Sequence, residues 1–227
     1  MAKEITVALA GNPNSGKTTV FNNLTGARQH TGNWPGKTVE KREGVCYYQD
    51  YAINVVDLPG CYSLTVYSLD EVIARDFIIE EKPNVVVNVL DASNLERNLY
   101  LTVQLLEMGA PLVLALNMMD EAEARNYDIN LSLLSQLLGV PVVSMIATRN
   151  QGSKQLLEEV INVAEGKVQV KGLKLEYGHE VEEEITTLEK LISQSELSQK
   201  YPARWLAIKL LENDEEVNKK FEEVEVG

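Results

Sequence analysis

The chain has 227 residues, of which 44% are hydrophobic and 24% are charged, values that are ordinary for a globular protein and exclude intrinsic disorder. Its 21 Lys and Arg and 34 Asp and Glu residues give a net charge of −13, which repels nucleic acids and anionic lipids and disfavours nucleic acid as a partner. We find no window with the ~20 apolar residues of a spanning helix, no signal peptide and too few cysteines for a disulfide scaffold, so we expect a soluble cytosolic chain.

Five short runs rich in Val, Ile and Leu recur along the chain: 5–10 (ITVALA), 51–57 (YAINVVD), 84–90 (NVVVNVL), 111–117 (PLVLALN) and 140–146 (VPVVSMI). Runs that are apolar on both faces are typical of parallel strands buried between two layers of helices. The stretch 37–49 alternates more and carries more charge, which indicates an antiparallel hairpin at a sheet edge. We therefore predict an α/β fold with a mostly parallel six-stranded sheet and one antiparallel edge strand.

Amphipathic stretches lie between these runs, where parallel strands require crossover helices: 17–24, 68–80, 95–107, 131–138 and 154–164. The alternation of strands and helices stops after residue 165. Residues 171–227 contain eight basic and fourteen acidic residues, a net charge of −6, and apolar residues recur there at helical spacing on either side of 193–202. We expect two or three short helices in this region, and we divide the chain into residues 1–167 and a helical subdomain of residues 168–227.

The first predicted strand runs into GNPNSGKT (11–18), which matches the pattern GxxxxGK[ST] and is followed by a helical stretch. Glycines in such a loop let successive backbone N–H groups and the helix N-terminus converge on a polyphosphate. Lys17 adds a positive charge for the β- and γ-phosphates, and the Thr18 hydroxyl is a ligand for Mg²⁺. A chance Gly-rich turn is the weaker interpretation of so long a match. We assign the phosphate site to Gly11, Asn12, Asn14, Ser15, Gly16, Lys17, Thr18 and Thr19.

A second motif, DLPG (57–60), ends the run at 51–57. Ligands of open α/β sheets bind at the carboxyl ends of the strands, so the Asp57 carboxylate is placed to hold a metal-bound water and the Gly60 amide to reach the γ-phosphate. Residue 61 is Cys, whereas Ras-type proteins have a Gln that orients the attacking water. We therefore expect slow hydrolysis, with the water positioned either by backbone groups or by Asp70.

A third motif, NMMD (117–120), ends the run at 111–117. The Asp120 carboxylate can accept hydrogen bonds from N1–H and the 2-amino group of guanine, donors that adenine does not offer, and the Met118 side chain can cover the purine face. An isolated NxxD has the alternative of a helix N-cap. The order of the three motifs, each after a different strand, favours a guanine nucleotide. We assign its base site to Asn117, Met118, Asp120, Ile146, Ala147 and Thr148.

Two longer strings are more specific: NWPGKTVE (33–40), which we name the first switch segment, and DASNLERNLYL (91–101). With DLPG and the Tyr-Ser-Leu of 62–64, they resemble the cytosolic N-terminal domain of the FeoB family of ferrous iron transporters, which are Ras-like P-loop GTPases. The resemblance covers essentially the whole chain and implies a Ras-like GTP-binding domain followed by a helical subdomain proposed to slow nucleotide release. It also implies a soluble portion of a longer protein, held at the cytoplasmic face of the cell membrane by a polytopic membrane domain.

The resemblance further implies roles for individual residues. Thr38 would be a second hydroxyl ligand of Mg²⁺, with Asp57 in the outer shell. Asn14 would bind a monovalent cation, potassium in relatives, together with backbone carbonyls near Gly32 and Trp34; the alternative for Asn14 is a side chain bonded to its own turn. Such a cation stabilises developing charge as an arginine finger does. We therefore expect a Mg²⁺-dependent, potassium-stimulated GTPase with catalytic residues Lys17, Thr38, Gly60 and Asn14 and metal ligands Thr18, Thr38, Asp57 and Asn14.

The expected role of the chain is to regulate or drive ferrous iron uptake through GTP. The partners implied are GTP and GDP, the membrane-embedded remainder of the transporter, small accessory Feo proteins and a second copy of the chain. Two alternatives stay open. A ribosome-assembly GTPase usually carries a basic appendage, whereas this one is acidic. A nucleotide-gated interaction module would present Trp34 and Tyr62 to a membrane partner.

Five other conspicuous side chains receive structural interpretations. We expect His30 and His179 to be exposed or locally bonded, because neither has a second ligand at metal spacing. Cys61 is expected to be partly exposed and oxidisable, and Trp205 to lie in a core. For Trp34, packing competes with mobility or partner contact.

Overall fold

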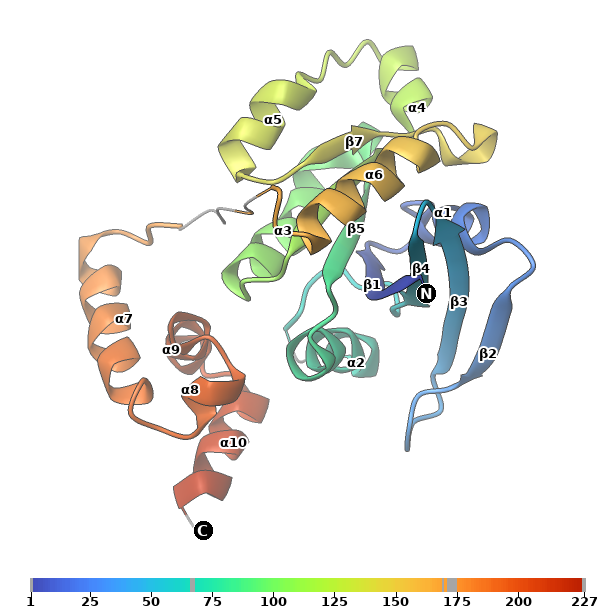
Figure 1. Cartoon of the computed structure of the whole chain (residues 1–227). Coiled ribbons are helices and arrows are strands. Elements are labelled where there is room, and N and C mark those ends of the chain that lie inside the picture. Colours follow the sequence, from blue (N-terminus) through green and yellow to red (C-terminus); the bar gives the residue numbers. More distant parts are fainter. Residues whose placement is uncertain (1, 66–67, 169, 171–174, 226–227) are drawn as a thin grey trace.

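The computed structural model describes residues 2–65, 68–168, 170 and 175–225, and Figure 1 shows their arrangement. Seven strands form one sheet in the order β2-β3-β4-β1-β5-β6-β7. Their bounds are β1 Lys3–Gly11, β2 Gln29–Asn33, β3 Glu40–Tyr48, β4 Tyr51–Asp57, β5 Val85–Asp91, β6 Leu112–Asn117 and β7 Val142–Ser144. Among these strands, β3 is antiparallel to both of its neighbours, and every other adjacent pair is parallel.

The sheet has one strand more than the sequence predicted. The expected reversed strand is present as β3, but β2 lies beyond it and forms the edge. The sequence of β2, QHTGN, is polar, and all of its residues are exposed, so no alternation of apolar and polar residues reveals it. The prediction of a mostly parallel α/β sheet is confirmed, and the count of six strands is corrected to seven.

Ten α-helices are described: α1 Lys17–Thr25, α2 Leu69–Asp76, α3 Leu95–Glu107, α4 Met119–Ala124, α5 Leu131–Leu138, α6 Ser153–Ala164, α7 His179–Ile192, α8 Leu197–Lys200, α9 Ala203–Leu211 and α10 Glu215–Glu225. The five predicted crossover helices are all among them. Helices α1 and α6 bury their apolar faces against one side of the sheet, and α2 and α3 cover the other side. Helix α2 is shorter than predicted because the chain continues as a π-helical turn over Phe77–Glu81.

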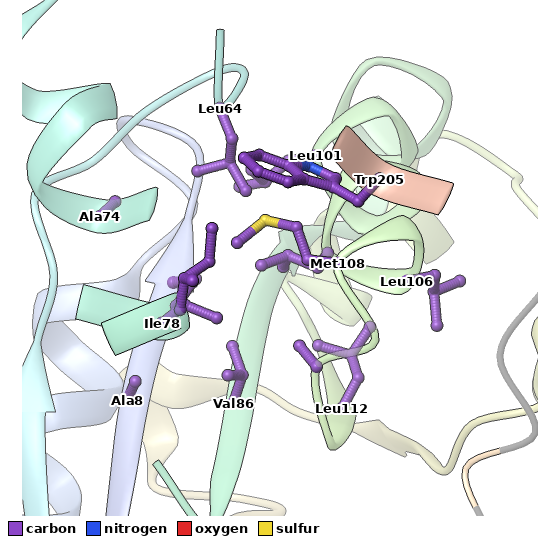
Figure 2. Packing of buried hydrophobic residues seen from close by; sticks show 14 of the residues in the cluster. Ala8, Leu64, Ala74, Ile78, Val86, Leu101, Leu106, Met108, Leu112 and Trp205 are labelled. Carbon is purple, nitrogen blue, oxygen red and sulfur yellow. The ribbon is translucent and has the colours of Figure 1, made fainter. Parts of the chain in front are cut away.

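Helices α7 to α10 pack against the α2 and α3 side through a shared hydrophobic cluster. Trp205 of α9 is buried in it, as predicted, and stacks on Tyr201 with ring centroids 6.0 Å apart. Figure 2 shows Trp205 close to Leu64 and Leu101 of the preceding part of the chain. Residues 169 and 171–174 lie outside the described residues, and the predicted boundary after residue 167 stays a prediction. Within the described ranges, no helix is long and apolar enough to cross a membrane.

A buried ion pair joins helix α2 to the helices α7 to α10. Nη1 of Arg75, in α2, lies 3.2 Å from Oδ2 of Asp214, which precedes α10, and their side chains are only 2% and 4% exposed. The guanidinium carbon lies 5.9 Å from the centroid of the Trp205 ring. Nε of Arg75 also lies 3.6 Å from Oδ1 of Asp76, which is partly exposed, so Asp214 is the buried partner of this guanidinium.

The variant Asp214→Ala is expected to lower the free energy of unfolding by about 3 kcal/mol, because it leaves the buried Arg75 charge with only the more distant, partly exposed Asp76 carboxylate. The double variant Arg75→Met/Asp214→Ser removes both charges of this pair. It keeps a side-chain oxygen near Val217 N, which donates to Asp214 Oδ1 at 3.1 Å. We expect it to recover most of the loss. Urea denaturation measures the free energy of unfolding of the unsubstituted chain and of both variants. A double variant no more stable than Asp214→Ala would contradict this account.

Candidate nucleotide-binding site

The phosphate loop is shaped by three residues with positive φ. Gly11, Asn14 and Gly16 have φ values of 157°, 67° and 86°, and Lys17 then begins α1. A Cβ added to Gly16 would lie 2.2 Å from Nδ2 of Asn117, so only glycine fits at this position. The loop therefore curls tightly between the end of β1 and the N-terminus of α1, the geometry that binds anions through backbone N–H groups.

Two polar side chains of this loop lack hydrogen-bond partners within the described protein. Both side-chain polar atoms of Asn12 and the hydroxyl of Ser15 are buried and form no hydrogen bond there. Buried polar groups in folded proteins are normally hydrogen-bonded, so orphaned groups at one loop are informative. A polar ligand seated at the loop fits this donor and acceptor set.

The structure brings Lys17 and Asp57 together. Nζ of Lys17 forms an ion pair with the Asp57 carboxylate and donates to the Leu58 carbonyl at 2.6 Å. Strands β1 and β4 are neighbours with Leu9 opposite Asp57, which places the end of β4 beside the phosphate loop. Because both charges are largely buried, a polyphosphate at the loop has to compete with Asp57 for Lys17.

The DLPG segment meets the phosphate loop through its backbone. Cys61 N donates to Gly11 O at 3.3 Å. A Cβ added to Gly60 would lie 3.5 Å from the backbone of Pro13, so the Gly60 backbone lies against the loop. The second motif therefore lies next to the first, as the sequence predicted.

The Asn117 side chain ties together the loops expected at the base. Its Nδ2 donates to Ser15 O at 2.9 Å, and its Oδ1 accepts from Ala147 N at 2.9 Å. The Ala147 carbonyl in turn accepts from Nδ2 of Asn23 at 2.7 Å. Sequence reasoning placed Asn117 at the base site but missed this tie, which joins residues 102 positions apart.

Asp120 lies in the first turn of α4, and the N-cap of that helix is Met118, with φ of 59°. The alternative of Asp120 as an N-cap is therefore wrong. Its Oδ2 lies 3.6 Å from Nη2 of Arg149, a partner that the sequence did not suggest. Ile146 and Thr148 flank the buried Ala147 in the loop that Asn117 holds.

Three expected ion ligands face solvent. Asn14 is exposed on the phosphate loop, Thr18 is exposed in the first turn of α1, and Thr19 is half-buried. Thr38 is exposed in the turn between β2 and β3, and no hydrogen bond joins it to the phosphate loop in the described part of the chain. The structure thus gathers Lys17, Asp57 and Gly60, whereas no hydrogen bond within the described residues ties Thr38 to them.

Two expectations about exposure are resolved by burial. Trp34 packs into the hydrophobic cluster, with its ring 5.5 Å from that of Phe77 in an edge-to-face arrangement, so packing is the correct alternative. Cys61 is 4% exposed, and the expectation of a partly exposed, oxidisable thiol is wrong. Burial, and then the nearby Glu71 carboxylate, raise the pKa of the Cys61 thiol to about 12. The side chains of His30 and His179 are exposed, as expected.

The phosphate loop, the DLPG segment and the NMMD motif, each at the carboxyl end of a strand in a mostly parallel sheet, define a P-loop protein with a GTPase-type fold. Residues 5–160 match the family described as ferrous iron transport protein B, and residues 177–226 match the FeoB cytosolic helical domain. The chain belongs to the FeoB family.

One curated relative is the Fe(2+) transport protein A/Fe(2+) transporter FeoB fusion protein of Porphyromonas gingivalis. It is 45% identical over 218 residues, which cover 95% of this chain and 26% of that protein. The chain spans about a quarter of the length of the curated relatives it matches.

Solved structures of the T. maritima FeoB cytosolic domain are also similar. The GDP form II has a TM-score of 0.92 at 39% identity, and the GMPPNP form has a TM-score of 0.91 at 40% identity. Each comparison covers 97% of this chain and 86% of the other.

We predict that neither Cys61 nor the other cysteine, Cys46, reacts with Ellman's reagent at mildly alkaline pH in the folded protein. Both thiols are buried, and burial raises the pKa of Cys46 as well, so few thiolates are present. Unfolding in guanidinium chloride should release both thiols together. Prompt labelling of Cys61 before unfolding, identified by mass spectrometry, would contradict its burial.

Proposed function

We propose that this chain is the GTP-binding and slowly GTP-hydrolysing cytosolic part of a ferrous iron transporter, at the cytoplasmic face of the membrane. The main support is the tie of Asn117 to Ser15 O and Ala147 N, which holds a phosphate loop and a guanine motif in one frame. Similar structures titled as GDP and GMPPNP forms support a guanine nucleotide. The proposed output is to regulate or drive ferrous iron uptake.

In the proposed reaction, the backbone of residues 11–16 holds the phosphates and Lys17 exchanges Asp57 for the β- and γ-phosphates. The Gly60 amide donates to the γ-phosphate, and Thr18, Thr38 and Asp57 would hold Mg²⁺. When bound, Mg²⁺ and potassium supply positive charge that stabilises the transition state. Cys61 is buried and protonated, so its side chain orients no water, and slow turnover follows.

Family membership and the burial of Trp34 bear on the two alternative functions and on the proposed partners. The ribosome-assembly alternative loses its support because the chain belongs to the FeoB family. The proposed partners are the membrane-embedded remainder, small accessory Feo proteins and a second copy of the chain. We retain the proposed division into a GTP-binding domain, 1–167, and a helical subdomain, 168–227, that slows nucleotide release. The interaction-module alternative now has only Tyr62 to present, because Trp34 is buried.

The variant Asp120→Asn is expected to weaken GDP binding by about 10- to 100-fold, because a charged acceptor for two guanine donors is lost. The same variant should gain affinity for xanthosine diphosphate, whose C2 carbonyl accepts from the new amide. Isothermal titration calorimetry with both nucleotides and with ADP measures this, and Asp128→Asn on the exposed loop after α4 is the matched control. Equal binding of GDP and ADP by the unsubstituted chain would overturn the guanine assignment.

Potassium stimulation is tested through Asn14. Because Asn14 has φ of 67°, Asn14→Gly removes the side chain without straining the loop. We expect kcat in potassium buffer to exceed that in sodium buffer by at least about tenfold in the unsubstituted chain, and this difference to disappear in the variant. Phosphate-release assays measure the rates. Identical turnover in both buffers for the unsubstituted chain would remove the potassium proposal and leave GTP binding intact.

A further inference from the structure

We propose that Gln104 and Arg97 of α3 are positioning residues for GTP hydrolysis, because they hold the segment 61–65 that follows Gly60. The inference rests on the proposed function, since it concerns the same site. It assigns a role to α3, which begins within the string 91–101 and which the phosphate and base motifs leave unexplained.

The Gln104 side chain binds the backbone of this segment. Its Oε1 accepts from Leu64 N at 2.7 Å, and both residues are buried. The Leu64 side chain belongs to the hydrophobic cluster that contains Trp205, and Figure 2 shows the two close together. Without the Gln104 oxygen, the Leu64 N–H would be buried with no acceptor, which is costlier than losing an exposed hydrogen bond.

Arg97 holds the same segment by a side chain. Its guanidinium carbon lies 4.1 Å from the centroid of the Tyr62 ring, a close cation–π contact. Arg97 and Gln104 are seven residues apart, two turns of helix, and therefore lie on the same face of α3. Between their contacts, Ser63 Oγ donates to Glu71 Oε1 at 2.9 Å.

The other end of the segment is bound to the phosphate loop, through Cys61 N and Gly11 O. The segment is thus fixed between the loop and α3, and its first residue directly follows Gly60. GDP has no γ-phosphate for the Gly60 amide to contact. Displacing the segment should therefore impair GTP hydrolysis while leaving GDP binding nearly unchanged.

The decisive pair of variants is Gln104→Leu and Gln104→Glu. Leucine keeps most of the volume and removes the acceptor, whereas glutamate keeps an acceptor oxygen whether or not it is protonated. We expect Gln104→Leu to lower kcat about tenfold or more with GDP affinity unchanged, and Gln104→Glu to restore most of the rate. Single-turnover phosphate release, GDP calorimetry and thermal unfolding are measured on each chain.

Arg97 provides an independent second arm. Arg97→Ala is expected to lower kcat about two- to fivefold, and Arg97→Lys, which keeps a cation for Tyr62, to restore most of it. Tyr100→Ala, an exposed substitution one turn further along α3, is the control and should leave the rate unchanged.

Three results would overturn the inference: a normal kcat in Gln104→Leu, no rescue by Gln104→Glu, or parallel losses of kcat, GDP affinity and melting temperature. The last pattern would mean a purely structural role. Failure of the proposed function looks different, because the unsubstituted chain would then bind neither GDP nor GTP.

Discussion

The side-chain amide of Asn117 is the interaction on which the site depends. One donor and one acceptor join the phosphate loop, the end of β6 and the loop at Ala147, which are distant in sequence. The amide lies so close to Gly16 that no side chain fits there. Because Asn117 is buried, breaking either bond leaves polar groups without partners, so the distance between the phosphate and base ends of the site is fixed by the fold.

The pairing of Lys17 with Asp57 explains how a chain with a net charge of −13 can receive a highly anionic ligand. The positive charge of Lys17 is buried and is neutralised by a carboxylate from the neighbouring strand. In the proposed reaction a ligand phosphate takes the place of Asp57 at Lys17, while the net negative charge of the chain repels polyanions that lack a complementary shape. Selectivity among polyanions thus depends more on the geometry of the phosphate loop than on the net charge of the chain.

Much of the frame could be predicted because the relevant signals are local. The buried strands appear as apolar runs, the phosphate loop as a glycine pattern, and the position of Asp57 follows from the rule that sites lie at strand ends. The polar strand β2 could not be predicted, since pairing with β3 alone makes it a strand. The burial of Trp34 and Cys61, the Asn117 tie and the contact of Arg149 with Asp120 all depend on residues far apart in sequence, and spacing does not report them.

The place of β2 in the sheet has a consequence for the first switch segment, which begins at the last residue of this strand. An outermost strand has a single neighbour, so it can unzip by breaking one ladder, whereas an interior strand would have to break two. The first switch segment, which contains Thr38 of the proposed Mg²⁺ site, is therefore attached to a strand that can leave the sheet by breaking its hydrogen bonds to β3 alone. The sequence of β2 is polar and contains Gly32, so the strand is a poor template for pairing with another chain. Detachment of β2 is therefore compatible with low aggregation through this edge.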